Sequence, residues 1–185
     1  MPRRPNSSTD EILTITLELI AEHDVSGVTV DMVAEKAGVS KATMYRRWAS
    51  KEELVIEAVT YLRHPKANPD TGFLRDDLTI LLKELVDFLN RPDGGKVFGA
   101  FQNAAIRNPK LSALNRRALH EARAPYERAI ARAIARGELA ANTNVQLMID
   151  VLISPILYRR LIEHTNARQS DIRMILDMAF TAFGR

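Results

Sequence analysis

Apolar residues recur three and four positions apart along almost the whole chain, and this spacing predicts an all-α fold. Residues 8–23 and 73–90 show the pattern clearly, each with one apolar face. No segment alternates apolar and polar residues in the manner of a strand bounded by turns. Glycine and proline fall mostly between the periodic segments, so the sequence divides into about nine predicted helices.

Polar residues at the starts of these segments predict where several helices begin. Ser8 and Ser50 each stand three residues before a glutamate, the spacing of a capping box. Thr29 and Ser40 are suitable N-caps for two short helices. Gly38 lies between those two helices and tolerates the positive φ that a sharp reversal requires.

Residues 29–48 therefore predict a helix-turn-helix, in which two short helices meet at a tight turn and the second faces outward. We interpret Trp48, at the end of the second helix, as a packing anchor rather than a ring that stacks on bases. The helices that follow are predicted at about residues 51–63, 73–90, 95–107, 110–136, 144–165 and 169–183.

The prolines at positions 65 and 69 mark a linker and divide the predicted organisation into two domains. Residues 1–64 form the predicted helix-turn-helix domain, and residues 65–185 form a larger helical domain for ligand sensing and dimerisation.

The composition narrows the class of protein. Hydrophobic residues make up 46% of the chain and charged residues 26%, which suits a soluble protein with a real core. There is no cysteine, so disulfides and thiolate metal sites are excluded. We expect neither a membrane span nor a signal peptide, because no long apolar run is present, and we expect a cytoplasmic location.

Charge supports nucleic-acid binding only locally. The net charge is +3, but residues 1–63 hold eight basic and ten acidic residues and are net negative. Between Lys36 and Lys51, however, the sequence contains five basic residues and no acidic one. Phosphate binding depends on positive charge at the contact surface rather than on the total for a domain.

The second short helix has side chains that suit a major groove. Ser40, Ala42 and Thr43 are small enough to let the backbone approach DNA closely. Thr43 can donate a hydrogen bond to a base or a phosphate, and Ala42 can touch a thymine methyl group. The alternative is a plain three-helix bundle, but that interpretation leaves the basic face around Tyr45 unexplained.

At this point the sequence resembles the DNA-binding domain of TetR-type regulators, the tetracycline-repressor-like family. The resemblance covers about residues 8–60. It rests on three stretches, Ala37-Gly38-Val39-Ser40, Thr43-Met44-Tyr45 and Ser50-Lys51-Glu52-Glu53-Leu54.

The resemblance implies a homodimer that binds a short pseudo-palindrome of double-stranded DNA, usually as a repressor released by a small-molecule effector. It implies phosphate contacts from Thr29, Ser40, Tyr45 and Lys51. It implies a place near the bases for Lys41, Ala42, Thr43 and Arg46, with Arg47 beside them. Many members have His or Tyr where the two arginines stand, so the base contacts at those positions differ here.

The last two predicted helices are apolar around nearly their whole circumference. A helix packed on one side of a monomer needs only one apolar stripe, so these two are expected to be buried on two sides, by their own domain and by a second subunit. The alternative is a pair of central helices within a monomer. The predicted dimer interface consists of Leu147, Val151, Ile156, Ile172, Ile175, Met178 and Phe183.

A ligand cavity is harder to predict, because its walls have the same residue types as ordinary core. Pro155 is expected to kink its helix and open space beside it. The candidate lining residues are Phe73, Leu78, Phe98, Phe101, Gln102, Tyr126, Ile130 and Tyr158. Asn103 and Arg107 would suit an anion or a polar ligand if they point inward.

Other features do not indicate chemistry. Arg128, Arg132 and Arg136 recur every four residues and are interpreted as a solvated face, with a second DNA-contacting surface as the alternative. No phosphate-binding loop, nucleophile elbow or metal-ligand spacing is present, so we predict no enzyme activity, no metal and no cofactor. The rival functions are an activator or ligand-independent DNA-binding protein and, more remotely, a helical small-molecule carrier.

Overall fold

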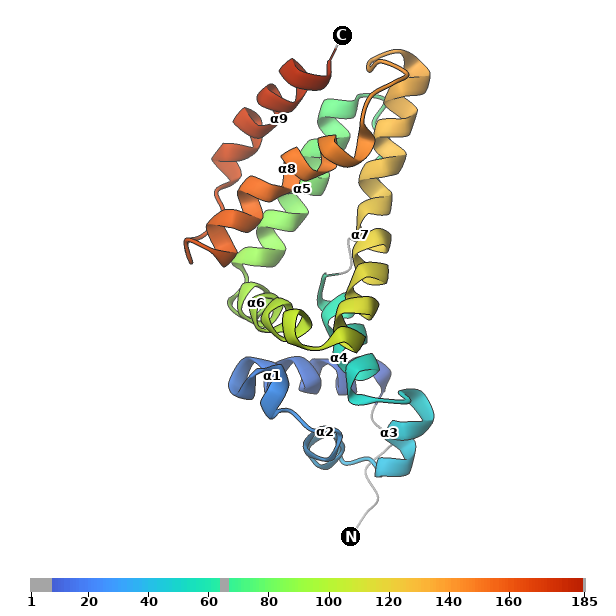
Figure 1. Ribbon diagram of the computed structural model, residues 1–185, viewed down its shortest axis with the longest axis vertical. Helices are drawn as coiled ribbons and strands as arrows, with labels where there is room; N and C mark the ends of the chain where they lie inside the picture. The colour runs from blue at the N-terminus through green and yellow to red at the C-terminus, as the bar shows by residue number, and fades with distance from the viewer. Residues whose placement is uncertain (1–7, 64–66, 185) are drawn as a thin grey trace. The chain divides into compact units, whose positions relative to one another are not determined.

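The computed structural model describes residues 8–63 and 67–184, and this part of the chain is all-helical, as predicted. The only β contact within it is an isolated bridge between residues 139 and 184. No helix in the described ranges is long and apolar enough to cross a membrane. The described residues form nine helices, drawn in Figure 1: α1 (Thr9–Gly27), α2 (Val30–Ala37), α3 (Lys41–Arg47), α4 (Lys51–Arg63), α5 (Leu74–Asn90), α6 (Pro92–Arg107), α7 (Pro109–Arg136), α8 (Val145–Leu161) and α9 (Gln169–Phe183).

The predicted helix starts are confirmed by their capping hydrogen bonds. The hydroxyl of Ser8 accepts from the amide of Glu11, and that of Ser50 accepts from the amide of Glu53. In α1 the regular helix stops at Asp24, whose φ of 58° and ψ of 168° are not helical. The expected end near residue 23 therefore corresponds to a kink, after which one short turn continues to Gly27.

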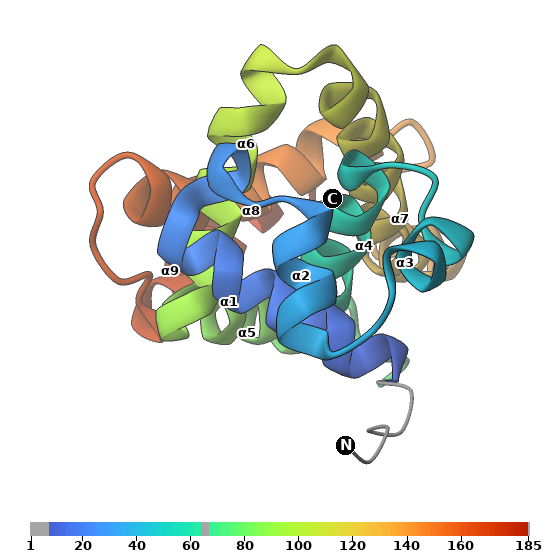
Figure 2. The same ribbon diagram turned by 90° about the horizontal axis from the view of Figure 1, so that it is seen from below.

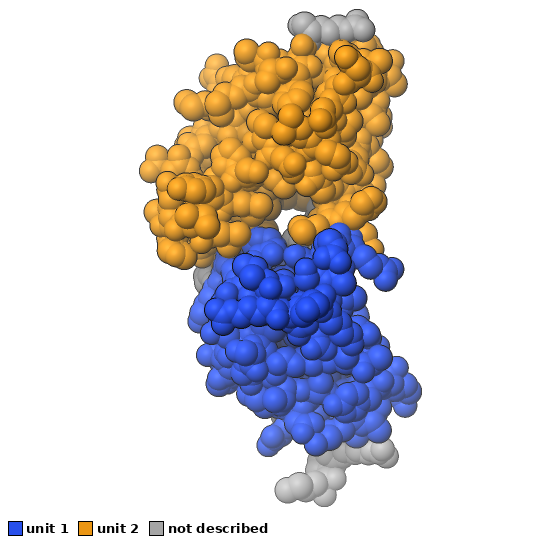
Figure 3. Space-filling view, in the orientation of Figure 1, with its two compact units in different colours: residues 1–64, 92–118 blue, residues 65–91, 119–185 orange. Residues whose placement is uncertain are grey.

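The described helices form two compact units that do not follow chain order (Figure 3). Unit 1 combines residues 1–64 with residues 92–118, and unit 2 combines residues 65–91 with residues 119–185. The predicted division between residues 64 and 65 falls outside the described residues. The unit that contains the helix-turn-helix segment also includes α6 and the start of α7.

Unit 1 is built around α1, which packs against α2, α4 and α6. The core includes the fully buried side chains of Ile12 and Ile20 from α1 and of Leu54 from α4. Removing such side chains from water is the main stabilising contribution, on the order of 2 kcal/mol each.

Unit 2 packs α5 against α8 and α9, and α8 against α9. α5 contributes a buried row at helical spacing, represented by Leu74, Leu78 and Leu82. Tyr126 of α7 is buried and donates its hydroxyl to the carbonyl oxygen of Leu81 at 3.2 Å. Its buried hydroxyl is thus satisfied within the unit.

The buried carboxylate of Asp77 forms hydrogen bonds that link the segment before α5 to helix α7. Asp77 is fully buried and accepts hydrogen bonds from the amide and the hydroxyl of Thr71, both at 2.8 Å, and from Arg132 at 3.2 Å. Arg132 also bonds to the carbonyl oxygen of Pro69, and Arg128 donates to Asn68 at 2.9 Å. Burial raises the pKa of Asp77, but the hydrogen bonds from Thr71 and Arg132 outweigh it and leave that pKa below its ordinary value.

Arg128 and Arg136 are exposed, as predicted for a solvated face, and Arg132 is half-buried. All three arginines have partners within unit 2. Arg128 and Arg132 hold residues 68–71 against the helix, and Arg136 pairs with Glu138 at 2.6 Å. Spacing alone could not show the contacts of Arg128 and Arg132, because their partners lie about 60 residues away in the sequence.

We expect Asp77→Asn to lower the free energy of unfolding by about 3 kcal/mol, because the buried Arg132 contact loses its charged partner. Urea denaturation at neutral pH measures the change, and Asp76→Asn, at the exposed neighbouring position, is the matched control.

The pH dependence has a defined sign. The folded-state pKa of Asp77 is lowered, so its stabilisation is complete above the unfolded-state pKa and is lost as pH falls through the folded-state value. The difference in free energy of unfolding between the native protein and Asp77→Asn should disappear at acidic pH. A difference in free energy of unfolding that does not change with pH would contradict this role of Asp77. An equal loss of stability in Asp77→Asn and Asp76→Asn would also contradict it.

Candidate nucleic-acid interface

The segment at residues 29–48 folds as two short helices joined by a tight turn. Thr29 caps α2 by accepting from the amide of Met32 at 3.2 Å, and Ser40 caps α3 by accepting from the amide of Thr43 at 3.1 Å. Gly38 ends α2 with a φ of 67°, a left-handed conformation that favours glycine. The hydroxyl of Thr29 accepts in its cap and retains a proton to donate, whereas the hydroxyl of Ser40 also lies 2.9 Å from that of Thr43.

Two buried side chains hold α3 to the rest of unit 1. Met44 and Trp48 are almost completely buried, and the indole Nε1 of Trp48 donates to the carboxylate of Glu57 on α4 at 2.6 Å. The interpretation of Trp48 as a packing anchor is confirmed. With these two residues facing inward, the opposite side of α3 faces solvent.

The outward side of α3 carries most of the residues predicted to contact DNA. Figures 1 and 2 show α2 and α3 at one end of unit 1, with α6 at the other. Tyr45 has 54% of its surface exposed despite its aromatic ring. Thr43 is half-buried, and the exposed members of this surface are Lys41, Ala42, Tyr45, Arg46 and Arg47.

This surface is not free of acidic groups, although the sequence between Lys36 and Lys51 is. The ammonium of Lys41 pairs with Asp31 of α2 at 2.6 Å. That hydrogen bond raises the pKa of Lys41. Lys36 pairs with Glu18 of α1 at 3.0 Å. The expectation of an acid-free face was wrong because acidic residues on neighbouring helices reach it.

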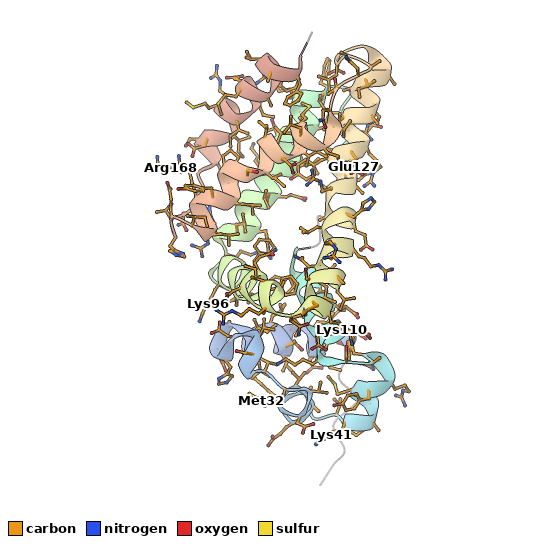
Figure 4. All side chains as sticks on the ribbon, viewed as in Figure 1. Met32, Lys41, Lys96, Lys110, Glu127 and Arg168 are labelled. Atoms are coloured by element: carbon orange, nitrogen blue, oxygen red, sulfur yellow. The ribbon has the colours of Figure 1, made fainter. Side chains whose placement is uncertain are left out.

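Lys51 is directed away from the surface of α3. Its Nζ donates to the carbonyl oxygen of Ser26 at 3.2 Å, close to the kink of α1. Burial lowers the pKa of this ammonium. Figure 4 labels Lys41 at the end of unit 1 formed by α2 and α3, and Lys110 on the start of α7.

Comparison with known proteins identifies the family. Residues 12–58 match the family described as bacterial regulatory proteins of the tetR family, and residues 68–179 match the tetracyclin repressor-like C-terminal domain. The second match alone covers more than half of the chain.

The chain belongs to the TetR family of transcriptional regulators. It is a DNA-binding regulator with a helix-turn-helix, and the family is not one of enzymes.

Two curated relatives agree with this assignment over most of the chain. An HTH-type transcriptional regulator of Mycobacterium tuberculosis is 33% identical over 171 residues, which cover 90% of this chain and 83% of that protein. The DNA-binding transcriptional repressor TetR of Mycobacteroides abscessus is 28% identical over 166 residues, 86% of this chain and 85% of the relative.

Solved structures share the fold. The TetR family transcription regulator SCO0332 superposes with a TM-score of 0.72 and is 26% identical, over 91% of this chain and 94% of that one. FadR from Bacillus subtilis, solved with stearoyl-CoA, has a TM-score of 0.69 over 91% of this chain and 95% of its own, and at 16% identity shows the fold alone.

The residues predicted for a dimer interface divide into two groups in this TetR-family chain. Ile156, Ile172 and Ile175 are buried in the core of unit 2. Leu147 and Met178 are each half exposed, and Val151 and Phe183 lie between these extremes. Further exposed apolar side chains on or directly after the same helices are Tyr158, Ile162 and Met174. α8 and α9 thus present apolar groups both to their own unit and to solvent.

The residues predicted to line a ligand cavity divide between the two units. Phe98, Phe101 and Gln102 lie in unit 1, and the other five lie in unit 2. Phe73 is 66% exposed because it stands at the N-cap of α5, ahead of the inward face, so its assignment to a cavity wall is not supported. Tyr158 is 55% exposed, so the same holds for it.

Leu78, Tyr126 and Ile130 are buried in unit 2. A small pocket of about 130 Å³ lies between α8 and α9 and contacts none of the eight predicted residues. Pro155, which was expected to open space beside its helix, lines this pocket. The other walls combine apolar residues with Arg159 and Asp171, which pair at 2.9 Å.

We expect Asp31→Asn to tighten binding to a fluorescent random-sequence DNA duplex by about twofold to fivefold, because it releases Lys41 from its ion pair and so leaves its positive charge available to the DNA. Fluorescence anisotropy at moderate salt measures this. Glu35→Gln removes an acidic side chain from the same helix and is the control. If both variants gain equally, general charge rather than the Lys41 pair is responsible.

Proposed function

We propose that this TetR-family protein is a repressor that binds a palindromic operator as a homodimer and is released by a small-molecule ligand. The observation that carries the proposal is α3, a short capped helix anchored by two buried side chains, whose other side is exposed and basic. Such a helix suits the major groove of double-stranded DNA. Binding to chromosomal DNA would make the cytoplasm its place of action.

The proposed contacts follow from where the side chains lie. Thr29, Ser40 and Tyr45 are exposed groups that can donate hydroxyl hydrogens to phosphates. Lys51 would have to leave the Ser26 carbonyl to reach a phosphate. We assign Lys41, Ala42, Thr43, Arg46 and Arg47 to the base-facing group, where arginine can pair with guanine and alanine can touch thymine.

Homodimerisation is supported by the exposed apolar side chains of α8 and α9. Leu147 and Met178 are half exposed, and Met174 and Ile162 more than half. Contiguous apolar groups of this kind mark interaction surfaces in soluble proteins. Two such helices from each subunit would form a four-helix interface, and a twofold axis would present two α3 helices to two half-sites.

Repression and ligand release are supported by relatives. The Mycobacteroides abscessus relative carries the name of a repressor, and FadR was solved with stearoyl-CoA. This chain has the matching C-terminal domain over residues 68–179. We therefore propose release by an effector, without assigning stearoyl-CoA to this protein.

A gel shift with the DNA upstream of the protein's own gene tests the function, because regulators of this kind often act locally. We expect a shift that weakens with salt and is competed by specific but not random DNA. Tyr45→Phe should weaken binding to all sequences alike, since it removes a phosphate donor. Thr43→Ala should instead change base preference by about 1 kcal/mol at one position.

The outcome that counts against this surface is unchanged operator binding in the Thr43→Ala/Tyr45→Phe double variant. Ser112→Ala is the control, because it also removes one hydroxyl in the same unit, but on α7 rather than on α3. Repeating the shift with candidate effectors separates release by ligand from constitutive binding, and a reporter gene separates repression from activation.

We expect Leu147→Glu/Met178→Glu to convert a dimer into a monomer at micromolar concentration, because two charges per subunit would be buried at the interface. Light scattering after size-exclusion chromatography gives the mass. Ile106→Glu replaces an apolar side chain that is 84% exposed in unit 1 and is the matched control. A wild-type monomer, or a variant that remains dimeric, would refute this interface.

A further inference from the structure

A pocket of about 370 Å³ lies inside unit 1, in the half of the structure that carries the helix-turn-helix. It is enclosed by the kinked end of α1, the first turns of α4, the second half of α6 and the start of α7. This volume falls within the usual range for small-molecule sites, roughly 300 to 1,000 Å³. The pocket is separate from the residues predicted to form a cavity and from the small pocket between α8 and α9.

The walls of this pocket, which we call the α1–α4–α6 pocket, combine an apolar surface with nitrogen donors. Val25 and Val55 are buried and supply apolar surface, and Ala104 leaves room beside them. Arg107 lies at the exposed side, and Asn103 stands one helical turn before it on α6. A ligand with an apolar body and a polar end fits such a lining.

Lys51 supplies a second cation to the same pocket. Its ammonium is half-buried and donates to the carbonyl oxygen of Ser26, which also lines the pocket. Burial lowers the pKa of Lys51, and the neighbouring carboxylate of Glu52 offsets part of this effect. A carbonyl oxygen carries only a partial charge, so an anion would stabilise this ammonium better.

Two acidic residues also line the pocket. The carboxylate of Glu52 accepts from Asn108 Nδ2 at 3.3 Å and lies 3.9 Å from the ammonium of Lys110. Its own backbone amide, and to a smaller extent Asn108, lower the pKa of Glu52. Glu52 therefore has partners already, and Asp24 is exposed at the kink of α1. Lys51 and Arg107 remain as cations that can face a ligand.

We propose that the α1–α4–α6 pocket binds a small aromatic or branched aliphatic carboxylate. The carboxylate would lie between Arg107 and Lys51, with Asn103 donating from the side, and the apolar body would pack on Val25 and Val55. This site is additional to any effector site in the C-terminal domain.

The site has a consequence for DNA, which rests on the proposed function. Lys51 is a proposed phosphate contact, and it can serve either a phosphate or the pocket. An anion in the pocket holds the ammonium inward, so DNA affinity falls when the pocket is filled. Binding of the carboxylate and of DNA are then coupled reciprocally.

Benzoate is the probe for the full-length protein, followed by titration calorimetry and by fluorescence of Trp48, the single tryptophan, which lies in the same unit. We expect benzoate to bind at least about tenfold more tightly than benzyl alcohol, because only the carboxylate pairs with the two cations. Equal affinity for the two, tighter binding of benzylamine, or no benzoate binding would overturn the proposal.

Single substitutions test whether benzoate binds in the α1–α4–α6 pocket. Arg107→Gln should weaken benzoate binding about tenfold or more, whereas Arg117→Gln, an exposed arginine in the same unit that does not line the pocket, should leave it unchanged. Ala104→Leu should also abolish binding by filling the cavity, and it keeps the proposal testable if Arg107→Gln fails to fold. Unchanged benzoate affinity in folded Arg107→Gln or Ala104→Leu would overturn it.

The operator shift separates the two proposals. If the protein binds its operator and benzoate weakens that binding in the native protein but not in Ala104→Leu, the coupled site is supported. If benzoate binds with the expected selectivity but no operator is bound, the proposed function fails while the pocket stands. If benzoate binds and operator affinity does not change, the coupling through Lys51 is overturned.

Discussion

The DNA-facing surface depends on the burial of two side chains, Met44 and Trp48. A helix of seven residues is too short to be stable in water by itself, so α3 exists because it is held from outside. Met44 and Trp48 are 1% and 4% exposed, and the indole adds a hydrogen bond to Glu57 of α4. Because Met44 and Trp48 face inward, the remaining side chains of α3 face solvent. Their orientation also depends on the position of α4, to which Trp48 is bonded.

Local signals made several helical boundaries predictable. Thr29, Gly38 and Ser40 act on residues no more than a few positions away, and each produced the cap or turn that its chemistry favours. Longer-range contacts were not predictable in this way. Lys41 meets Asp31 from another helix, and Arg132 meets Pro69 and Asp77 some 60 residues earlier. A pattern of charges along one helix cannot show which neighbouring helix faces it.

The two terminal helices show the same limit for apolar residues. Their nearly continuous hydrophobicity predicted apolar groups on more than one side, yet it could not tell which residue faces the core of unit 2. Ile156 and Tyr158 are two positions apart on α8, and only Ile156 is buried within unit 2. The division arises from where α5 and α9 pack on α8, which depends on tertiary structure. Phe73 shows the same limit, since it has a core-like side chain at the N-cap position of α5.

The basic groups of the DNA-binding unit are partly satisfied within the protein itself. Lys41 pairs with the carboxylate of Asp31, and Lys51 donates to the backbone carbonyl of Ser26. In the proposed DNA complex, each lysine would give up that internal oxygen for an oxygen of the DNA. The affinity for DNA then depends on the difference between the contacts with DNA and the internal contacts that they replace. It is therefore weaker than the number of basic residues suggests. Such a difference is sensitive to small changes in the internal contacts. The Ser26 carbonyl belongs to the short turn after the kink at Asp24, so the conformation of α1 there sets how easily Lys51 is released. This arrangement suits a regulator that must dissociate from its operator. A shift of one lysine between two contacts changes the affinity of the protein for DNA, while the exposed surface of α3 stays folded.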